Sequence, residues 1–149
     1  MSGDSALTQA QKDDLRVLAG LIIPPSDTYG VPGADDPAIQ ADMLATMGRD
    51  TAQVCSALDH AARLAGGRLG DLDPVQREAV AQELRTMGGA AVATLARVVL
   101  QTYYRDDRVV RSLGLEPRPP FPKGHVLEDG DWSLLDAVRA RPPMWRRVP

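Results

Sequence analysis

Apolar residues recur at helical spacing through the first two thirds of the chain. Leu15, Leu18 and Ile22 lie on one face of the first expected helix, and the prolines at 24 and 25 end it. The helices expected from this spacing cover residues 9–23, 37–47, 51–65, 74–87 and 90–104. Alternation of apolar and polar residues, typical of strands, is absent. Packing of helices against one another is therefore the only core available.

Start and stop signals mark the ends of these helices. Thr8 and Gln11 fit a capping box, and aspartate followed by proline opens two further helices at 36–37 and 73–74. Asp50 or Thr51 is expected to cap the helix between them. The acidic pairs at 13–14, 35–36 and 106–107 lie at or near expected helix starts and are interpreted as caps.

The pattern changes after residue 104. A short helix is expected from Asp107 to Leu113, prolines at 117, 119, 120 and 122 then predict an extended path, and Asp131 is expected to cap a last helix over 132–139. The sequence predicts an all-α protein, a small irregular helical bundle of about five to seven helices. The bundle covers residues 1–116 of a single domain, and residues 117–149 form an extended, proline-rich C-terminal segment with one short helix.

Composition favours a folded, soluble chain without reactive centres. The 44% of apolar residues suffices for a core, and the single cysteine, Cys55, excludes an intramolecular disulfide and a multi-cysteine metal site. The chain has no apolar run of about 20 residues and no export signal. We therefore expect the cytoplasm if the chain is complete, the periplasm if an export leader has been removed, and no direct insertion into a membrane.

Candidate catalytic and ligand-binding motifs are weak. His60 and His125 are far apart, the acidic run at 128–131 lacks the spacing of a calcium loop, and the glycines at 66–70 follow a helix rather than a strand. We therefore expect no catalytic, cofactor-binding or metal-binding residues in this chain. Nucleic acid is also a poor match, since residues 1–102 hold eight basic and 13 acidic residues.

The C-terminal end has a different character. Residues 139–149 contain four arginines and no acidic residue, together with Met144 and Trp145. Five of the six aromatic residues lie after position 102, where they accompany most of the prolines. A tryptophan exposed to water leaves a large apolar area unburied, and protein interfaces commonly bury such side chains. We interpret this end as a clamp on an acidic partner surface. Residues 24–36, a long irregular connection, are a second candidate contact segment.

Three segments carry a resemblance to a known family. They are residues 18–24 (LAGLIIP) with 32–34 (PGA), 103–109 (YYRDDRV) with 113–114 (LG), and 134–139 (LLDAVR) with 141–146 (RPPMWR). In these segments the chain resembles the gluconate 2-dehydrogenase subunit 3 (gamma subunit) family. The resemblance implies a non-catalytic small subunit that binds and stabilises a large FAD-dependent sugar or alcohol oxidoreductase of the glucose-methanol-choline type. The FAD and the catalytic histidine would then lie in the partner.

This hypothesis assigns residues 24–36 and 117–149 to the contact with the large subunit. The side chains expected there are Tyr29, Tyr103, Tyr104, Phe121, His125, Trp132, Met144, Trp145, Arg146 and Arg147. Two alternatives remain. One is a free-standing helical adaptor or oligomerising protein that offers its prolines at 117–122 as a PxxP-like ligand. The other is a small enzyme built around His125 and the carboxylates that follow it.

Overall fold

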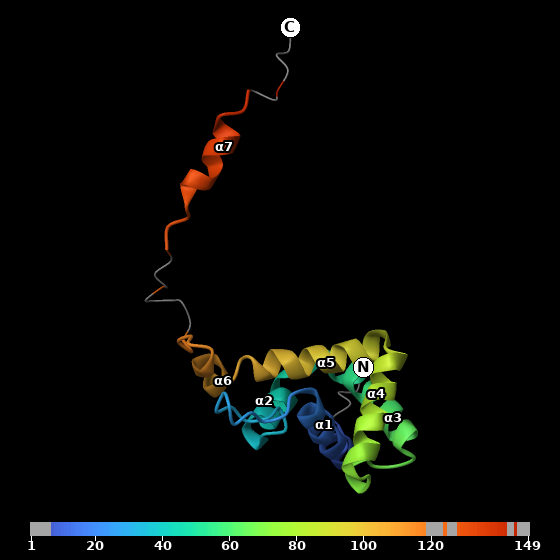
Figure 1. Ribbon diagram of the computed structural model, residues 1–149. Coiled ribbons are helices and arrows are strands. Elements are labelled where there is room, and N and C mark those ends of the chain that lie inside the picture. Colours follow the sequence, from blue (N-terminus) through green and yellow to red (C-terminus); the bar gives the residue numbers. More distant parts are fainter. Residues whose placement is uncertain (1–6, 119–123, 125–127, 143–144, 146–149) are drawn as a thin grey trace. The chain divides into compact units, whose positions relative to one another are not determined.

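The computed structural model of the chain describes residues 7–118, 124, 128–142 and 145. These residues divide into two units, Met1–Pro117 and Arg118–Pro149, which we call the body and the tail (Figure 1). Helices make up the regular structure, and the described residues contain no strand beyond an isolated bridge between Ser26 and Val31. The all-α class predicted from the sequence is therefore confirmed.

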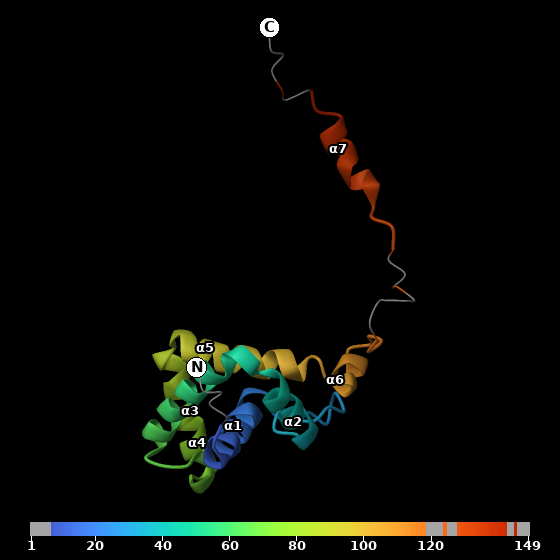
Figure 2. The ribbon, with the colours of Figure 1, turned by 180° about the vertical axis from the view of Figure 1, so that it is seen from behind.

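Six α-helices and two short 3-10 helices form the body over its described residues, 7–117. They are α1 (Gln9–Ile22), α2 (Pro37–Thr46), η1 (Gly48–Asp50), α3 (Thr51–Ala65), η2 (Leu69–Asp71), α4 (Pro74–Met87), α5 (Gly89–Tyr103) and α6 (Asp107–Ser112). Each expected helix is present and ends within two residues of its predicted bounds. Figures 1 and 2 both show α5 along one edge of the body, with α6 at one end of it and α3 and α4 at the other.

The caps explain why these helices start where they do. Capping boxes open α1 at Thr8 and α4 at Asp73, and the Asp36 carboxylate accepts the first free amides of α2. Gly66 ends α3 with φ of 67°, in the left-handed region that glycine adopts without a steric cost. Asp50 is an exception, because its side chain makes no capping bond. It pairs instead with Arg97 on α5, at 2.8 Å.

The helices of the body pack around one hydrophobic core. Helix α3 packs against α5, α4 and α1, while α2 packs against α5. Each of the helices α1 to α6 presents aliphatic side chains to this centre, and burying each one contributes about 1.5–3 kcal/mol relative to leaving it exposed. The largest fully buried side chains are Leu15, Leu18, Ile39, Met43, Val54, Leu58, Leu69, Leu95 and Val99.

The tail contains one helical segment in its described part. A 3-10 turn, η3 (Trp132–Leu135), continues into α7 (Asp136–Arg139), and Asp131 caps the start as expected. The extended path predicted for the prolines from 119 to 122 lies outside the described residues. Across the described segments, no helix combines the length and the apolar character that crossing a bilayer requires.

Candidate partner-binding surfaces

The three tyrosines predicted to contact a partner differ in position. Tyr29 and Tyr104 are exposed, at the turn before α2 and at the end of α5. Tyr103 is only 4% exposed and belongs to the core. Its hydroxyl donates to the carbonyl of Pro32 at 3.1 Å, and its ring meets Tyr104 edge-on. Tyr103 therefore holds the body together instead of facing a partner, because the apolar ring gains more from burial inside the core.

The connection before α2, residues 24–36, has a defined shape. Ser26 and Val31 exchange two backbone hydrogen bonds of 3.0 and 3.1 Å, and the amide of Ala34 donates to the carbonyl of Ile23 at 2.9 Å. Gly33 sits so close to Pro25 and Asp35 that a Cβ atom there would collide with both. The connection thus folds back on itself and is held against the end of α1 by these hydrogen bonds. It presents Tyr29 at its exposed turn.

A shared arginine links this connection to α6. Arg108 bonds both Asp36 and Asp106, the capping residues of α2 and α6, with closest contacts of 2.9 Å to each. The hydrogen bonds from Arg108 are the largest cause that lowers the pKa of each carboxyl group. Both carboxylates therefore stay ionised and keep α6 beside the start of α2. The exposed side chains Leu113 and Leu115 follow directly after α6.

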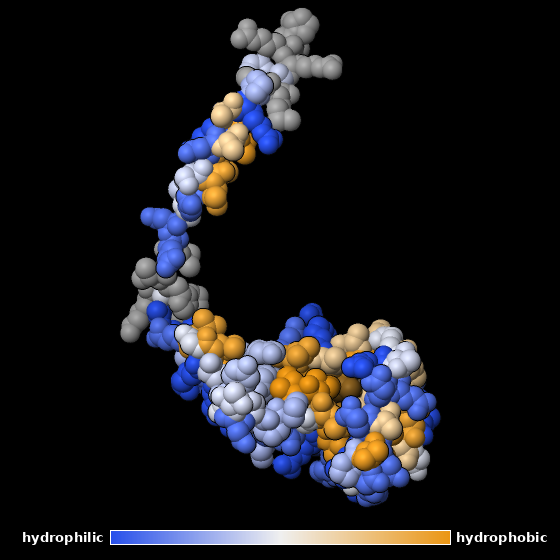
Figure 3. Space-filling model, viewed as in Figure 1, coloured by the Kyte–Doolittle hydropathy of each residue, from blue (hydrophilic) through white to orange (hydrophobic). Residues whose placement is uncertain are grey.

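The helical segment of the tail exposes an apolar face. Trp132, Leu135 and Val138 are spaced by three residues and are 66%, 41% and 57% exposed. Leu134 beside them is exposed as well, and Figure 3 shows hydrophobic side chains (orange) along one side of this segment. The sequence reasoning selected Trp132 but missed the three aliphatic residues. Leu135 lies three residues after Trp132, and Val138 lies three residues after Leu135 and four after Leu134. This helical spacing was the signal that could have found them.

Trp145, near the C-terminus, is also exposed, at 65%. The other expected contact residues, Phe121, His125, Met144, Arg146 and Arg147, lie outside the described residues.

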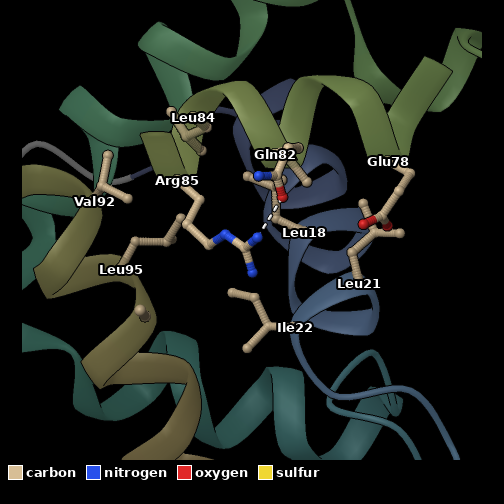
Figure 4. A pocket seen from close by; sticks show the side chains of 11 residues that line it. Leu18, Leu21, Ile22, Glu78, Gln82, Leu84, Arg85, Val92 and Leu95 are labelled. Carbon is tan, nitrogen blue, oxygen red and sulfur yellow. Dashed lines mark hydrogen bonds between the residues drawn. The ribbon is translucent and has the colours of Figure 1, made fainter. Parts of the chain in front are cut away.

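An apolar hollow of about 290 Å³ opens on the body between α1, α4 and α5 (Figure 4). Its apolar lining consists of Leu18, Leu21, Ile22, Ala81, Leu84, Val92, Leu95 and Ala96. The polar side chains are Glu78, Gln82 and Arg85, all on α4. In Figure 4 the Arg85 guanidinium extends between Leu95 and Ile22, where it donates to Gln82. These lining residues include no nucleophile beside a general base, so the hollow offers an apolar surface rather than a reactive centre.

The candidate reactive residues of the body lie in structural positions. Cys55 is half-buried on α3, and burial raises the pKa of its thiol, which disfavours the reactive thiolate. His60, also half-buried on α3, has its Nδ1 atom 2.7 Å from Arg63 one turn further on. Within the described residues, no group of three or more histidine, cysteine, aspartate or glutamate side chains is arranged to hold a metal ion.

Comparison of the chain with protein-family models, with curated proteins and with solved structures found no match. The resemblance in sequence therefore rests on the three quoted segments alone. In the structure these segments supply the end of α1 with the connection that follows it, the junction of α5 with α6, and the helical part of the tail. The first two meet in the hydrogen bond between Tyr103 and Pro32.

Proposed function

We propose that this chain is a non-catalytic accessory subunit that binds and stabilises a large FAD-dependent oxidoreductase acting on sugars or alcohols. The observation that carries the proposal is the exposed apolar face of the tail, formed by Trp132, Leu135 and Val138. Large aromatic and aliphatic side chains of this kind supply most of the binding energy at protein interfaces. Their exposure, in a chain whose body has a complete core, supports a role in binding another polypeptide.

The length of the tail helix supports the same proposal. The segments η3 and α7 together span eight residues, whereas isolated helices shorter than about 12–15 residues are marginal in water. A partner that covers the apolar face would supply the packing energy that this short helix lacks. The tail would then be stable as a helix in the complex.

The identity of the partner follows from the sequence resemblance. It implies that the large subunit holds the FAD and the catalytic histidine, so that the chemistry takes place in that chain. The small subunit would contribute contact area, including Tyr29 on the body and Trp132 on the tail. Its expected effect is on folding, flavin retention or activity of the large subunit.

Co-expression with a large FAD-dependent oxidoreductase of the glucose-methanol-choline type, the flavoprotein expected as its partner, tests the proposal. We expect the full chain to co-purify with the flavoprotein and to raise its soluble yield, its FAD content per polypeptide and its activity. A chain that ends at Pro117 keeps the body but lacks the exposed tail face, so it should give little of this increase. Equal yield, flavin content and activity with and without the tail would contradict the proposal. A full chain that is monodisperse on its own and does not bind the flavoprotein would favour the adaptor alternative.

A further inference from the structure

The charges of the tail helix are separated along its axis. Glu128, Asp129 and Asp131 precede the helix, and within residues 128–142 the only basic side chains, Arg139 and Arg141, stand at its other end. Asp136 pairs with Arg139 at 3.3 Å, which leaves the separation between the two ends intact. All of these side chains are exposed. The segment therefore has a negative end, an apolar middle and a positive end.

The cap and the helical geometry of the segment fix the positions of these charged and apolar side chains along it. Asp131 accepts hydrogen bonds from the backbone amide and the hydroxyl group of Ser133, at 3.1 and 2.6 Å, and so fixes where the helix begins. Residues three apart lie on one side of a helix, which places Trp132, Leu135 and Val138 in a single row. The row runs from the acidic end to the basic end.

We infer that residues 128–141 bind as a helix, in one direction, in an apolar groove of the large subunit whose rim is basic at one end and acidic at the other. Trp132, Leu135 and Val138 enter the groove, the basic rim meets Glu128 and Asp129, and the acidic rim meets Arg139 and Arg141. This inference rests on the proposed function for the identity of the partner.

The charge pattern argues against an anionic surface as the occupant of this face. An anionic membrane or a nucleic acid would attract the two arginines but repel the three carboxylates at the opposite end. A second copy of this chain has the matching charge pattern when two tails lie antiparallel, so a free full chain that elutes as a dimer in gel filtration, and as a monomer when it is truncated after Pro117, would overturn the inference. A groove with both charges on its rim satisfies both ends and sets the direction of the helix.

The apolar contact is tested with the full chain co-expressed with the tagged large subunit. Val138→Gln places a polar amide in the apolar row, and we expect at least about tenfold weaker binding, the loss typical of an interface hot spot. Ala140→Gln is the matched control, because it adds the same uncharged side chain two residues further on, about 200° around the helix. The amount of small subunit bound per large subunit should stay within about twofold of wild type for this control.

The direction of binding is tested by the double variant Glu128→Arg with Asp129→Arg. We expect weaker binding, because the new positive charges would face the basic end of the rim. A partner with a uniformly acidic rim would instead bind this variant more tightly, and that result would overturn the inferred polarity. The double variant Arg139→Glu with Arg141→Glu should also bind more weakly, with a loss that diminishes at high salt.

The outcomes separate the two proposals. If the wild-type full chain fails to co-purify with the large subunit, the proposed function fails and the inference fails with it. If wild type binds but Val138→Gln binds as well as Ala140→Gln, the inference alone is wrong and the subunit contacts its partner elsewhere. Thermal unfolding of each purified variant by circular dichroism controls for the body, whose transition should match that of wild type.

Discussion

Asp14 is a buried carboxylate that joins two elements of the body. It is 4% exposed, and its Oδ1 atom accepts a hydrogen bond from the amide of Leu69 at 2.9 Å. Burial is the largest cause acting on its carboxyl group and raises the pKa, against the opposing effects of the Leu69 amide and the Arg68 charge. Asp14 thereby anchors the start of η2 to the middle of α1, and it carries a desolvation cost whenever it is ionised.

Asp14→Asn should change how the stability of the body depends on pH. The folded state holds the Asp14 proton more tightly than the unfolded chain, where the pKa is about 3.9. The stabilisation of the folded state by this tightly held proton is therefore fully present below about pH 4. It is lost as the pH rises through the raised pKa of Asp14 in the folded state. Asparagine keeps an oxygen for the Leu69 amide and has no charge, so the variant should gain stability relative to wild type between pH 4 and pH 7.

Urea unfolding at several pH values measures this difference. Asp13→Asn is the control for the loss of one carboxylate, since the Asp13 side chain is 44% exposed and pairs with Arg68. We expect it to change the free energy of unfolding by less than about 1 kcal/mol, as for other exposed ion pairs. A difference between Asp14→Asn and wild type that stays constant from pH 4 to pH 7 would show that the Asp14 carboxyl group does not titrate abnormally.

The sequence alone misplaced Asp14, and the reason is physical. An acidic pair near a helix start is typical of capping, yet Asp14 is the sixth residue of α1 and caps η2, 55 positions further along the chain. Asp36 and Asp106 were correctly predicted as caps, because their partners are local. The bridge that Arg108 makes between them depends on how α6 meets α2, and no local pattern encodes that meeting.

At the scale of elements, the connection before α2 depends on Gly33. A Cβ atom at this position would collide with the Asp35 carboxylate and would lie 2.9 Å from Cδ of Pro25. The proline ring is part of the backbone and cannot rotate away. We therefore expect Gly33→Ala to destabilise the body by about 1–3 kcal/mol, the usual cost of overpacking. The measurement is the midpoint of unfolding in urea.

Gly70→Ala provides the matched control for that experiment. A Cβ atom on Gly70 would meet no neighbour within 4 Å. The expected change in the free energy of unfolding is within about 0.5 kcal/mol, as for most surface substitutions. If Gly33→Ala were as stable as Gly70→Ala, the close packing of the connection against Pro25 would be wrong.

The helices were the most predictable part of the fold, because their signals are local. Caps, prolines and apolar spacing determine where each one begins and ends, and the structure agrees to within two residues. The tertiary position of the connection was not predictable in this way. A hydrogen bond from Tyr103 to Pro32, 71 residues away in the sequence, holds the connection in place. The same contact explains why Tyr103 lies in the core and not on the expected partner surface.

At the scale of the whole molecule, the hydrophobic core of the described residues lies in the body. Every buried apolar side chain among the described residues lies between Leu7 and Val109. Both tryptophans, by contrast, belong to the tail, and both are largely exposed. The buried core and the two exposed tryptophans thus belong to different parts of the chain. The body is expected to fold without the tail.

Truncation after Pro117 tests this separation. The shortened chain keeps every buried apolar side chain and the hydrogen bond from Leu115 to Val110 that follows α6. Circular dichroism should show one cooperative transition whose midpoint lies within about 2 °C of that of the full chain, since a difference of 1 kcal/mol shifts the midpoint of a domain of this size by several degrees.

In the free full chain, tryptophan emission should stay at the wavelength of solvent-exposed indole throughout thermal unfolding. A blue-shifted emission that moves to longer wavelength as the helices melt would show that the indoles are buried before unfolding. The tail would then already be covered without a partner, and the exposed face that motivates the accessory-subunit proposal would not exist in solution.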